Sequence, residues 1–236
     1  MKNNRKNALA KSLEENLSII NLKYDDKKEM SDKDKRMMEK KPKLVKVDYL
    51  NLLPNPPANN SSETKQELEQ IRKRVARTDN SPELKNLVMA IDINPDVPFE
   101  KIAKKHNIKY PSKEMDRIYR NVVEPIMWQL KWKYNRPRPY QLAKKLGMDF
   151  KHFESPRKTH YTPSYPSGHA MYGYLVALIL SDMYPEHVKE WMEAAKVVGD
   201  ARVNQGVHYP SDMKASAYIT KLIWDDIKDK YENILT

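Results

Sequence analysis

The segment 168–183, GHAMYGYLVALILSDM, is the most apolar part of this 236-residue chain. Apolar residues fall on every side of a helix drawn through it, a pattern typical of a helix buried among others. The weakly polar run from Ala170 to Leu180 is much shorter than the roughly 20 residues that a membrane-spanning helix needs. We therefore expect a central helix inside a soluble protein.

Amphipathic helices are predicted on both sides of this central segment. Apolar residues recur at helical spacing from about 62 to 77, and Ser81-Pro82-Glu83 begins a further helix with an N-cap serine followed by proline. Other helices are expected at about 98–106, 112–135, 185–204 and 210–233, with a kink at Pro125. The alternating β-branched runs that indicate strands do not occur. The predicted fold class is all-α, a compact helical bundle.

Two proline-rich segments interrupt the helical pattern. Residues 49–63, YLNLLPNPPANNSSE, cannot form regular structure and are expected to run extended over the surface, anchored by Leu50, Leu52 and Leu53. Residues 151–166 contain three prolines and lead as a loop into the central helix.

Charge divides the chain unevenly. Its net charge is +11, and residues 1–46 contain 14 Lys and Arg against 8 Asp and Glu. We interpret residues 1–45 as a basic extension, partly disordered or helical and solvated, and 46–236 as the functional domain. The extension could meet a polyanion or a membrane surface weakly. The first 20 residues contain no apolar signal segment and the chain has no cysteine, so a cytoplasmic location is expected and thiol or disulfide chemistry is excluded.

Three short segments concentrate groups suited to binding a tetrahedral oxyanion. KWKYNRPRP (131–139) contains Lys131 and Arg138, and YPSGHA (165–170) places Ser167, Gly168 and His169 at the start of the most apolar helix. Free N–H groups and a hydroxyl at a helix N-terminus form an anion site. ARVNQGVHYPSD (201–212) contains an arginine, a histidine and an aspartate. Each signal alone is weak, and their combination is what predicts a site.

The spacings Lys-x6-Arg-Pro, Pro-Ser-Gly-His and Arg-x5-His-x3-Asp, in this order, resemble the signature of the type 2 phosphatidic acid phosphatase (PAP2) superfamily. Within it, the chain is most similar to the soluble bacterial class A non-specific acid phosphatases, which are all-helical proteins of similar length. The resemblance extends over about residues 50–225. It includes LLPNPPANNSSE before the first core helix and ALILSDMYPE after the second motif.

This resemblance implies a role for each motif residue. His208 would attack phosphorus and form a phosphohistidine, Asp212 would orient its ring, and His169 would act as general acid and then general base. Phosphate would be bound by five residues: Lys131, Arg138, Ser167, Gly168 and Arg202. No metal or other cofactor is expected, and the partner is a small phosphomonoester. Oligomeric state is left open.

Two departures and two alternatives accompany this interpretation. Ala201 stands where the family usually has a serine, and the extension replaces the signal peptide of secreted members. Vanadium-dependent haloperoxidases share the motifs and hold vanadate in the same pocket, but they are generally much longer. The second alternative is a polyanion-binding protein with a degenerate phosphatase site.

Overall fold

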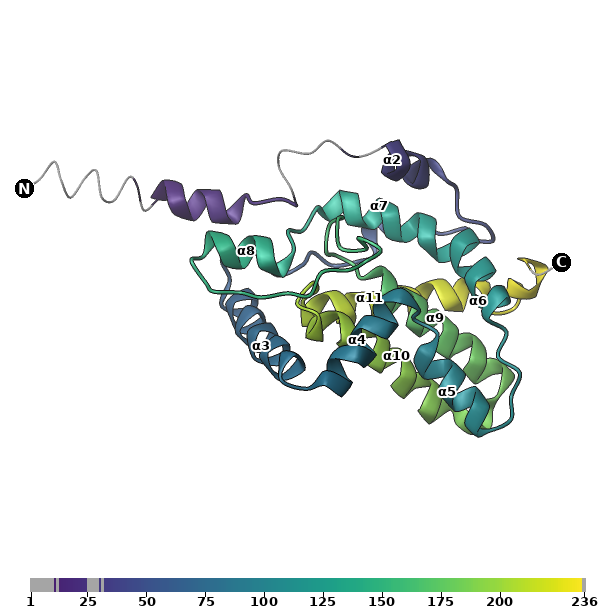
Figure 1. Ribbon diagram of the computed structural model, residues 1–236. Coiled ribbons are helices and arrows are strands. Elements are labelled where there is room, and N and C mark those ends of the chain that lie inside the picture. The colour runs from purple at the N-terminus through teal and green to yellow at the C-terminus, as the bar shows by residue number, and fades with distance from the viewer. Residues whose placement is uncertain (1–10, 12, 25–29, 31, 235–236) are drawn as a thin grey trace, which may run out of the picture.

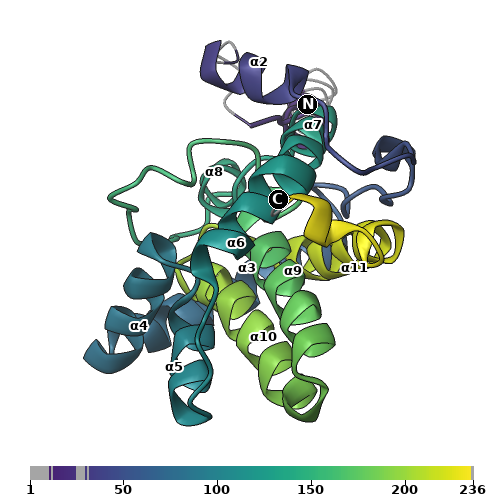
Figure 2. The same cartoon turned by 90° about the vertical axis from the view of Figure 1, so that its right-hand side faces the viewer.

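The computed structural model describes residues 11, 13–24, 30 and 32–234, and every regular element among them is helical (Figure 1). The predicted all-α class is confirmed. Helix α9 (Gly168–Met183) packs against α10 (Val188–Asn204) and α11 (Pro210–Ile227). Figure 2 shows α9 and α10 side by side, with α5 (Val97–Lys105) against the outer side of α10.

Helix α9 is the buried centre of the molecule, as its composition predicts. Leu175, Val176, Ile179 and Leu180 have no exposed surface, and burying each such side chain contributes about 1.5–3 kcal/mol. A Cβ atom at Gly173 would lie 3.2 Å from Cβ of Val198 on α10. The glycine therefore allows these two helices to approach closely.

The other helices follow the predicted pattern, with one addition. Helices α3 (Ser62–Asp79) and α4 (Pro82–Ile93) are capped by the serines that precede them. The hydroxyls of Ser61 and Ser81 accept the backbone N–H groups of Thr64 and Leu84, three residues later. The C-terminal helix α11 ends at Ile227, and a separate 3₁₀ turn covers Tyr231–Ile234. Helix α8 (Pro139–Lys145) was not predicted: Pro139 begins a new helix, and the Gln141 side chain accepts the N–H of Arg138.

The kink expected at Pro125 takes the form of a π-helical turn. Helix α6 (Ser112–Ile118) continues through this turn, Tyr119–Val123, into α7 (Glu124–Tyr134). Proline has no N–H for the carbonyl four residues earlier, and its ring would clash with that carbonyl. Here that carbonyl belongs to Asn121, and it accepts the backbone N–H of Lys43 instead, at 2.8 Å.

Two parts of the extension, residues 19–24 and 32–39, contact the core, so the expectation of a solvated tail is wrong for them, whereas residues 13–18 are exposed. Residues 13–20 are helical, and α2 (Asp32–Glu39) lies against α7 (Figure 1). The amide of Asn59 donates to backbone carbonyls of residues 19, 20 and 22, and the Gln129 amide donates to the carbonyl of Met38. Tyr24 is buried, donates its N–H to Asn135 O, and meets Trp132 edge-on.

The segment after the extension is anchored differently from the prediction. Residues Tyr49–Asn51 form a 3₁₀ turn, and Tyr49 and Leu53 are buried while Leu52 is 42% exposed. Leu50 packs at the edge of the core as expected. The hydroxyl of Tyr49 contacts Asp226 near the end of α11, at 3.2 Å. Leu52 turns outward because the helical turn places it on the opposite side from its neighbours.

Gly206 makes the sharp connection between α10 and α11. Its φ is +83°, and a Cβ there would lie 3.0 Å from the Lys151 carbonyl oxygen and 3.0 Å from the Val75 side chain. Positive φ and close backbone approach both favour glycine. This turn allows the end of α10 and the start of α11 to contribute to the same site.

Replacing Gly206 by alanine is expected to lower the free energy of unfolding by about 2–3 kcal/mol, from backbone strain and the close contact with the Lys151 carbonyl. Gly147→Ala is the matched control, because its φ is +67° but no atom lies within 4 Å of the added Cβ. The control is expected to cost about 1 kcal/mol. Urea denaturation measures both, and equal losses would contradict the steric argument.

Candidate active site

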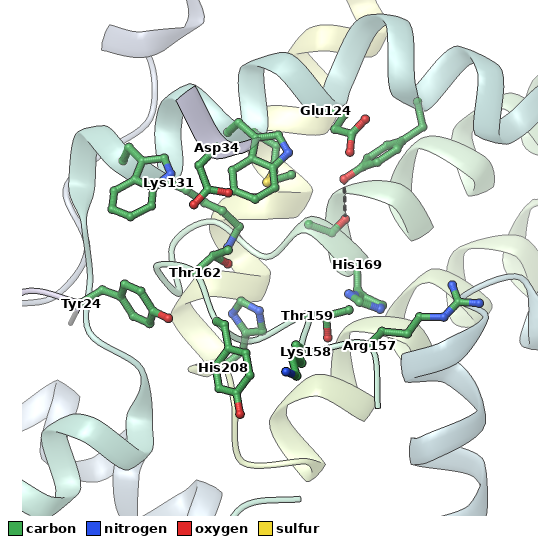
Figure 3. A pocket seen from close by; sticks show the side chains of 16 residues that line it. Tyr24, Asp34, Glu124, Lys131, Arg157, Lys158, Thr159, Thr162, His169 and His208 are labelled. Atoms are coloured by element: carbon green, nitrogen blue, oxygen red, sulfur yellow. Dashed lines mark hydrogen bonds between the residues drawn. The ribbon is translucent and has the colours of Figure 1, made fainter. Parts of the chain in front are cut away.

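The three motif segments meet at one cavity of about 540 Å³ (Figure 3). Lys131, Gly168, His169 and His208 line it, together with residues of the loop 157–162 and aromatic side chains of α7. Arg138, Arg202, Asp212 and Ser167 are almost fully buried around these residues. All eight residues predicted from the motifs are therefore in or beside one cavity, although their roles remain predictions.

His208 is held by two partners of opposite charge. Its Nδ1 lies 2.9 Å from Oδ2 of Asp212, and its Nε2 lies 2.8 Å from Nη1 of Arg138. A guanidinium can only donate, so Nε2 accepts and the ring proton is on Nδ1, where it is donated to the carboxylate. Pro210 begins α11, and this places Asp212 one turn after His208. The lone pair of Nε2 therefore points toward the Arg138 guanidinium.

Asp212 is itself held in place by residues for which no role was predicted. Arg136 Nη1 donates to Asp212 Oδ1 at 2.7 Å and to the Ser211 hydroxyl at 2.8 Å. Glu67 of α3 accepts the Ser211 N–H at 2.6 Å and lies 3.3 Å from Arg136 Nη2. Burial raises the pKa of Glu67, although Arg136 opposes this shift. Arg136 and Glu67 were not predicted from the sequence, and the first arginine in NRPRP (135–139) was the available signal for Arg136.

Three buried cations surround the histidine and are held by the loop 151–166. Lys131 donates to Pro163 O at 2.5 Å, and Arg138 donates to the carbonyl and hydroxyl oxygens of Thr162 at 2.7 and 3.1 Å. Arg202 donates to the Thr159 hydroxyl at 2.9 Å. Burial lowers the pKa of Lys131 and of Arg202, and lowers that of Arg138 to about 10. An anion in the cavity would therefore stabilise all three cations, of which Lys131 lines the cavity and the two arginines lie beside it.

His169 and Arg202 are linked through Asp92, a residue that the sequence analysis missed. The Asp92 side chain is fully buried and pairs with Nη1 of Arg202. Its backbone carbonyl lies 3.2 Å from Nε2 of His169. Burial would raise the pKa of Asp92, but the charge of Arg202 together with the hydrogen bonds of Ser155 and Thr159 outweighs burial, and the pKa is lowered. Since a carbonyl can only accept, Nε2 carries a proton and Nδ1 is the nitrogen available to exchange one.

Ser167 caps α9 in the empty site, and its role as a phosphate ligand stays a prediction. Its side chain is fully buried, and its hydroxyl caps α9 by accepting the N–H of Ala170 at 3.4 Å. The N–H of Ser167 donates to the Ser216 hydroxyl at 2.9 Å. Gly168 lines the cavity at the first turn of α9, where backbone N–H groups have no helical acceptor. Its carbonyl accepts from the Tyr119 hydroxyl at 3.3 Å (Figure 3).

The basic surroundings keep the histidines neutral. Burial, and then the charge of Arg138, lowers the pKa of His208 well below its usual value. Burial and the charge of Arg202 lower the pKa of His169 to about 3. A dianion in the cavity would offset these charges and favour protonation. The cavity is therefore suited to a neutral nucleophile at His208 and to an acid at His169 that gains its proton with the bound anion.

A second cavity of about 640 Å³ adjoins the first. His169, Gly168, Tyr119 and Thr159 line both cavities, so His169 lies between them. In Figure 3, His169 and Arg157 lie on one side of the site, whereas Tyr24, Asp34 and Lys131 lie on the other. A bound molecule therefore has room on either side of His169.

The N-terminal extension contributes to the first cavity directly. Tyr24 and Asp34 line it together with Trp128 and Trp132 of α7 (Figure 3). Both residues from the extension are less than a tenth exposed. The interpretation of residues 1–45 as separate from the site is therefore wrong at these two positions. Sequence motifs gave no signal of this contact, because it depends on how α2 packs on α7.

Residues 121–224 match the family model described as the PAP2 superfamily. This stretch contains all three motifs. The resemblance to that superfamily is confirmed for this part of the chain. Among the helices that the structure describes, none combines the length and the apolar character required to cross a membrane.

Curated relatives match over shorter segments. A non-specific acid phosphatase of Salmonella typhimurium is 45% identical over 56 residues, which are 24% of this chain and 22% of the relative. An acid phosphatase of Zymomonas mobilis is 40% identical over 52 residues (22% and 20%), and a non-specific acid phosphatase of Providencia stuartii is 33% identical over 89 residues (38% and 35%). The matched segments thus span about a fifth to a third of these relatives' lengths.

A solved structure shares the fold. The crystal structure of the first bacterial vanadium dependant iodoperoxidase aligns with 78% of this chain and 55% of its own, with a TM-score of 0.56 and 16% sequence identity. At this identity the likeness establishes the helical architecture alone.

Removing residues 1–45 is now expected to damage the site, contrary to the solvated-tail interpretation. The shortened chain loses Tyr24 and Asp34 from the cavity wall, and it exposes the apolar surface of Trp128 and Trp132. We expect lower solubility and at least a tenfold drop in kcat/KM on an aryl phosphate. Tyr24→Ala in the full chain tests the wall contact without removing the extension. Unchanged turnover in both variants would restore the original interpretation.

The stability of the empty protein is expected to fall as pH is lowered below about 6.5. His160, His169 and His208 have lowered pKa values, of about 4 and 3 for the first two. The unfolded chain therefore binds protons that the folded chain excludes, and this costs up to about 1.4 kcal/mol per pH unit for each histidine. The raised pKa values of Glu67 and Glu124 act in the opposite direction at lower pH.

Thermal unfolding between pH 7 and pH 4, with and without inorganic phosphate, measures this effect. Phosphate should flatten the pH dependence, because its charge allows His169 and His208 to protonate in the folded state. His169→Gln is the control. It should lower by about one the number of protons taken up on unfolding, and so make the dependence of stability on pH less steep. A melting temperature that rises with falling pH would contradict the assignment.

Proposed function

We propose that this protein hydrolyses phosphomonoesters without a catalytic metal, through a phosphohistidine on His208. The observation that carries the proposal is the arrangement of His208, with Nδ1 bonded to buried Asp212 and Nε2 accepting beside Arg138. A neutral imidazole with its proton fixed on the far nitrogen is an activated nucleophile. The similarity of short segments to acid phosphatases supports the same reaction class.

Substrate binding would first release the nucleophile. In the empty cavity the lone pair of His208 Nε2 accepts a hydrogen bond from Nη1 of Arg138, and Lys131 donates to the carbonyl of Pro163. Phosphate oxygens are better acceptors for these cations, because the hydrogen bonds become charge-assisted. Arg138, Arg202, Lys131 and the N–H groups near Gly168 would then surround the three equatorial oxygens, and stabilising these oxygens is most of what phosphoryl transfer requires.

In the first chemical step, Nε2 of His208 would form a bond to phosphorus while the bond from phosphorus to the ester oxygen breaks. His169 would donate its proton to the departing oxygen and become neutral. The imidazolium that forms at His208 keeps its Nδ1 proton, and Asp212 stabilises its positive charge. Arg136 holds Asp212 in place during this change.

In the second step, neutral His169 would take a proton from water as the water oxygen attacks phosphorus. The bond between phosphorus and Nε2 breaks, and both histidines return to their starting charge states when phosphate leaves. The low pKa of His169 in the empty cavity means that its first proton arrives with the substrate. A phosphomonoester monoanion can supply this proton, which favours activity below the second phosphate pKa of about 6.

His208→Ala is expected to abolish the phosphoenzyme and lower kcat by at least 10⁴-fold, because His169, the other histidine in the described cavity lining, has no carboxylate hydrogen-bonded to its ring. His169→Ala should slow alkyl phosphates by about 10²–10⁴-fold, and aryl phosphates far less, since good leaving groups need little protonation. Rapid-quench labelling detects the phosphoenzyme. Near-normal turnover by the His208 variant would sink the proposed mechanism.

Vanadate separates this proposal from the haloperoxidase alternative. As a trigonal-bipyramidal mimic of the transition state it should bind with His208 as axial ligand and inhibit hydrolysis. EDTA should change the rate of hydrolysis by less than about twofold, because the proposed reaction uses no catalytic metal. Peroxide-dependent iodide oxidation in the vanadate-loaded protein, with no hydrolysis of any ester, would favour the alternative.

The finer features of the function remain proposals. The class of ester is best resolved with a panel of aryl, nucleoside and sugar phosphates and phosphatidic acid. Weak contact with a polyanion through residues 1–46, a cytoplasmic location and a homo-oligomeric state stay predictions from sequence. Salt-dependent binding to nucleic acid by the His208→Ala protein would support the polyanion-binding alternative.

A further inference from the structure

A cluster of two histidines and a glutamate lies in the loop 151–166, outside the cavity lining. His152, Glu154 and His160 each offer one ligand atom, and these atoms lie within 4.8 Å of one another. Nε2 of His152 is 3.1 Å from Glu154 Oε1, and Nε2 of His160 is 3.0 Å from Glu154 Oε2. Two imidazoles and a carboxylate form a donor set suited to zinc and similar transition metals.

His160 gives a second, independent observation. Its side chain has no exposed surface, and neither ring nitrogen makes a hydrogen bond among the residues that the structure describes. Glu154 is close to Nε2 but does not lie in the direction of a hydrogen bond. A buried polar group without a partner costs about 1–3 kcal/mol. A metal ion at Nε2 would supply the missing partner.

The surroundings orient both rings and leave the cluster accessible. Tyr140 stacks on His152 with ring centroids 4.2 Å apart and meets His160 edge-on at 6.0 Å. The Glu154 side chain is 65% exposed. Solvent can therefore reach the cluster, and water can serve as a fourth ligand.

We propose that His152, Glu154 and His160 bind one divalent transition-metal ion, such as Zn²⁺, which holds the loop 151–166 in place. Catalytic-type zinc sites use three such protein ligands and a water. Here the ion has a structural position, because the same loop provides the acceptors for the three cations of the cavity: Thr159, Thr162 and Pro163. Fixing the loop would fix these acceptors.

The neighbouring charges couple this site to the anion cavity. Arg138 donates to Thr162 and Arg202 donates to Thr159, on either side of His160 in the loop. These two guanidinium groups repel a cation bound at His160. An oxyanion in the cavity cancels part of this repulsion, so each ligand should tighten binding of the other.

A comparable cluster elsewhere is less suited to a metal. His106, His187 and Glu190 also lie within 4.8 Å by their ligand atoms. Lys105 already pairs with Glu190 at 2.7 Å, and the two histidine rings stack face to face at 3.8 Å. The ammonium competes with a cation for the carboxylate, and stacked rings do not direct both lone pairs to one point. This cluster serves as the internal control.

The test uses the full chain without a polyhistidine tag, stripped with EDTA and dialysed, and titrated with Co²⁺ at pH 7 by calorimetry and visible absorption. We expect one ion per chain. Glu154→Gln should weaken binding at least tenfold, as should His160→Gln, whereas His187→Gln should leave it unchanged. Because Glu154 is exposed, its variant is expected to fold even if the His160 variant does not. Sulfate, an oxyanion that leaves Co²⁺ in solution, should tighten binding several-fold.

Amide exchange gives a readout independent of turnover. Zn²⁺ should slow exchange across residues 157–162 in the natural chain and not in the Glu154→Gln variant. The proposal is overturned if no ion binds, if Glu154→Gln binds as tightly as the natural chain, or if His187→Gln removes the binding. Hydrolysis of aryl phosphate in EDTA tests the proposed function separately, since that reaction does not use this ion.

Discussion

Repulsion among three buried cations is the constraint on which the rest of the site depends. Lys131, Arg138 and Arg202 come from the ends of three helices and are each at most 4% exposed. A buried charge without partners costs several kcal/mol. The fold offsets this cost with Asp92 and with carbonyl and hydroxyl oxygens of the loop 151–166. The loop has little regular structure because its polar groups are used as acceptors for these side chains.

The same constraint explains the second layer of residues. Asp212 orients His208 and is paired with Arg136, and Glu67 pairs with Arg136 in turn. Negative and positive groups therefore alternate outward from the cavity toward α3. Such alternation allows a strongly basic centre to be buried without leaving neighbouring charges unpaired. It also fixes the position of α3, a helix that contains no motif residue, relative to the start of α11.

The sequence was sufficient for the parts of the site that depend on spacing within one helix or turn. His208 and Asp212 are four residues apart across a helix start, and Ser167 to His169 open α9, so their local geometry could be predicted. Asp92 and the extension could not be found in this way. Asp92 meets Arg202 across 110 positions of sequence, and Tyr24 reaches the cavity through packing on α7.

The fold, like the site, could be predicted from the sequence in some parts and not in others. Helix bounds were predictable where a serine cap or an apolar stripe defines them, as for α3, α4 and α9. Helix α8 was not predicted because the prolines of RPRP (136–139) indicate the end of the preceding helix. Proline is equally suited to the first turn of the next helix, and Pro139 has this position. The pattern around Ser167 is the same for a helix cap and for a phosphate ligand, so the sequence alone does not distinguish these two roles.

Pro125 has an effect that reaches beyond the bend in its own helix. Because proline lacks an N–H, the carbonyl of Asn121 has no donor four residues later, and it accepts the N–H of Lys43. The carbonyl of Arg120, in the same turn, accepts from the Lys40 side chain. A defect in the hydrogen-bond ladder of α6–α7 is thus a docking point for a segment some 80 residues earlier. The bend in α6–α7 and the attachment of the extension therefore share one cause, the missing N–H of a single proline.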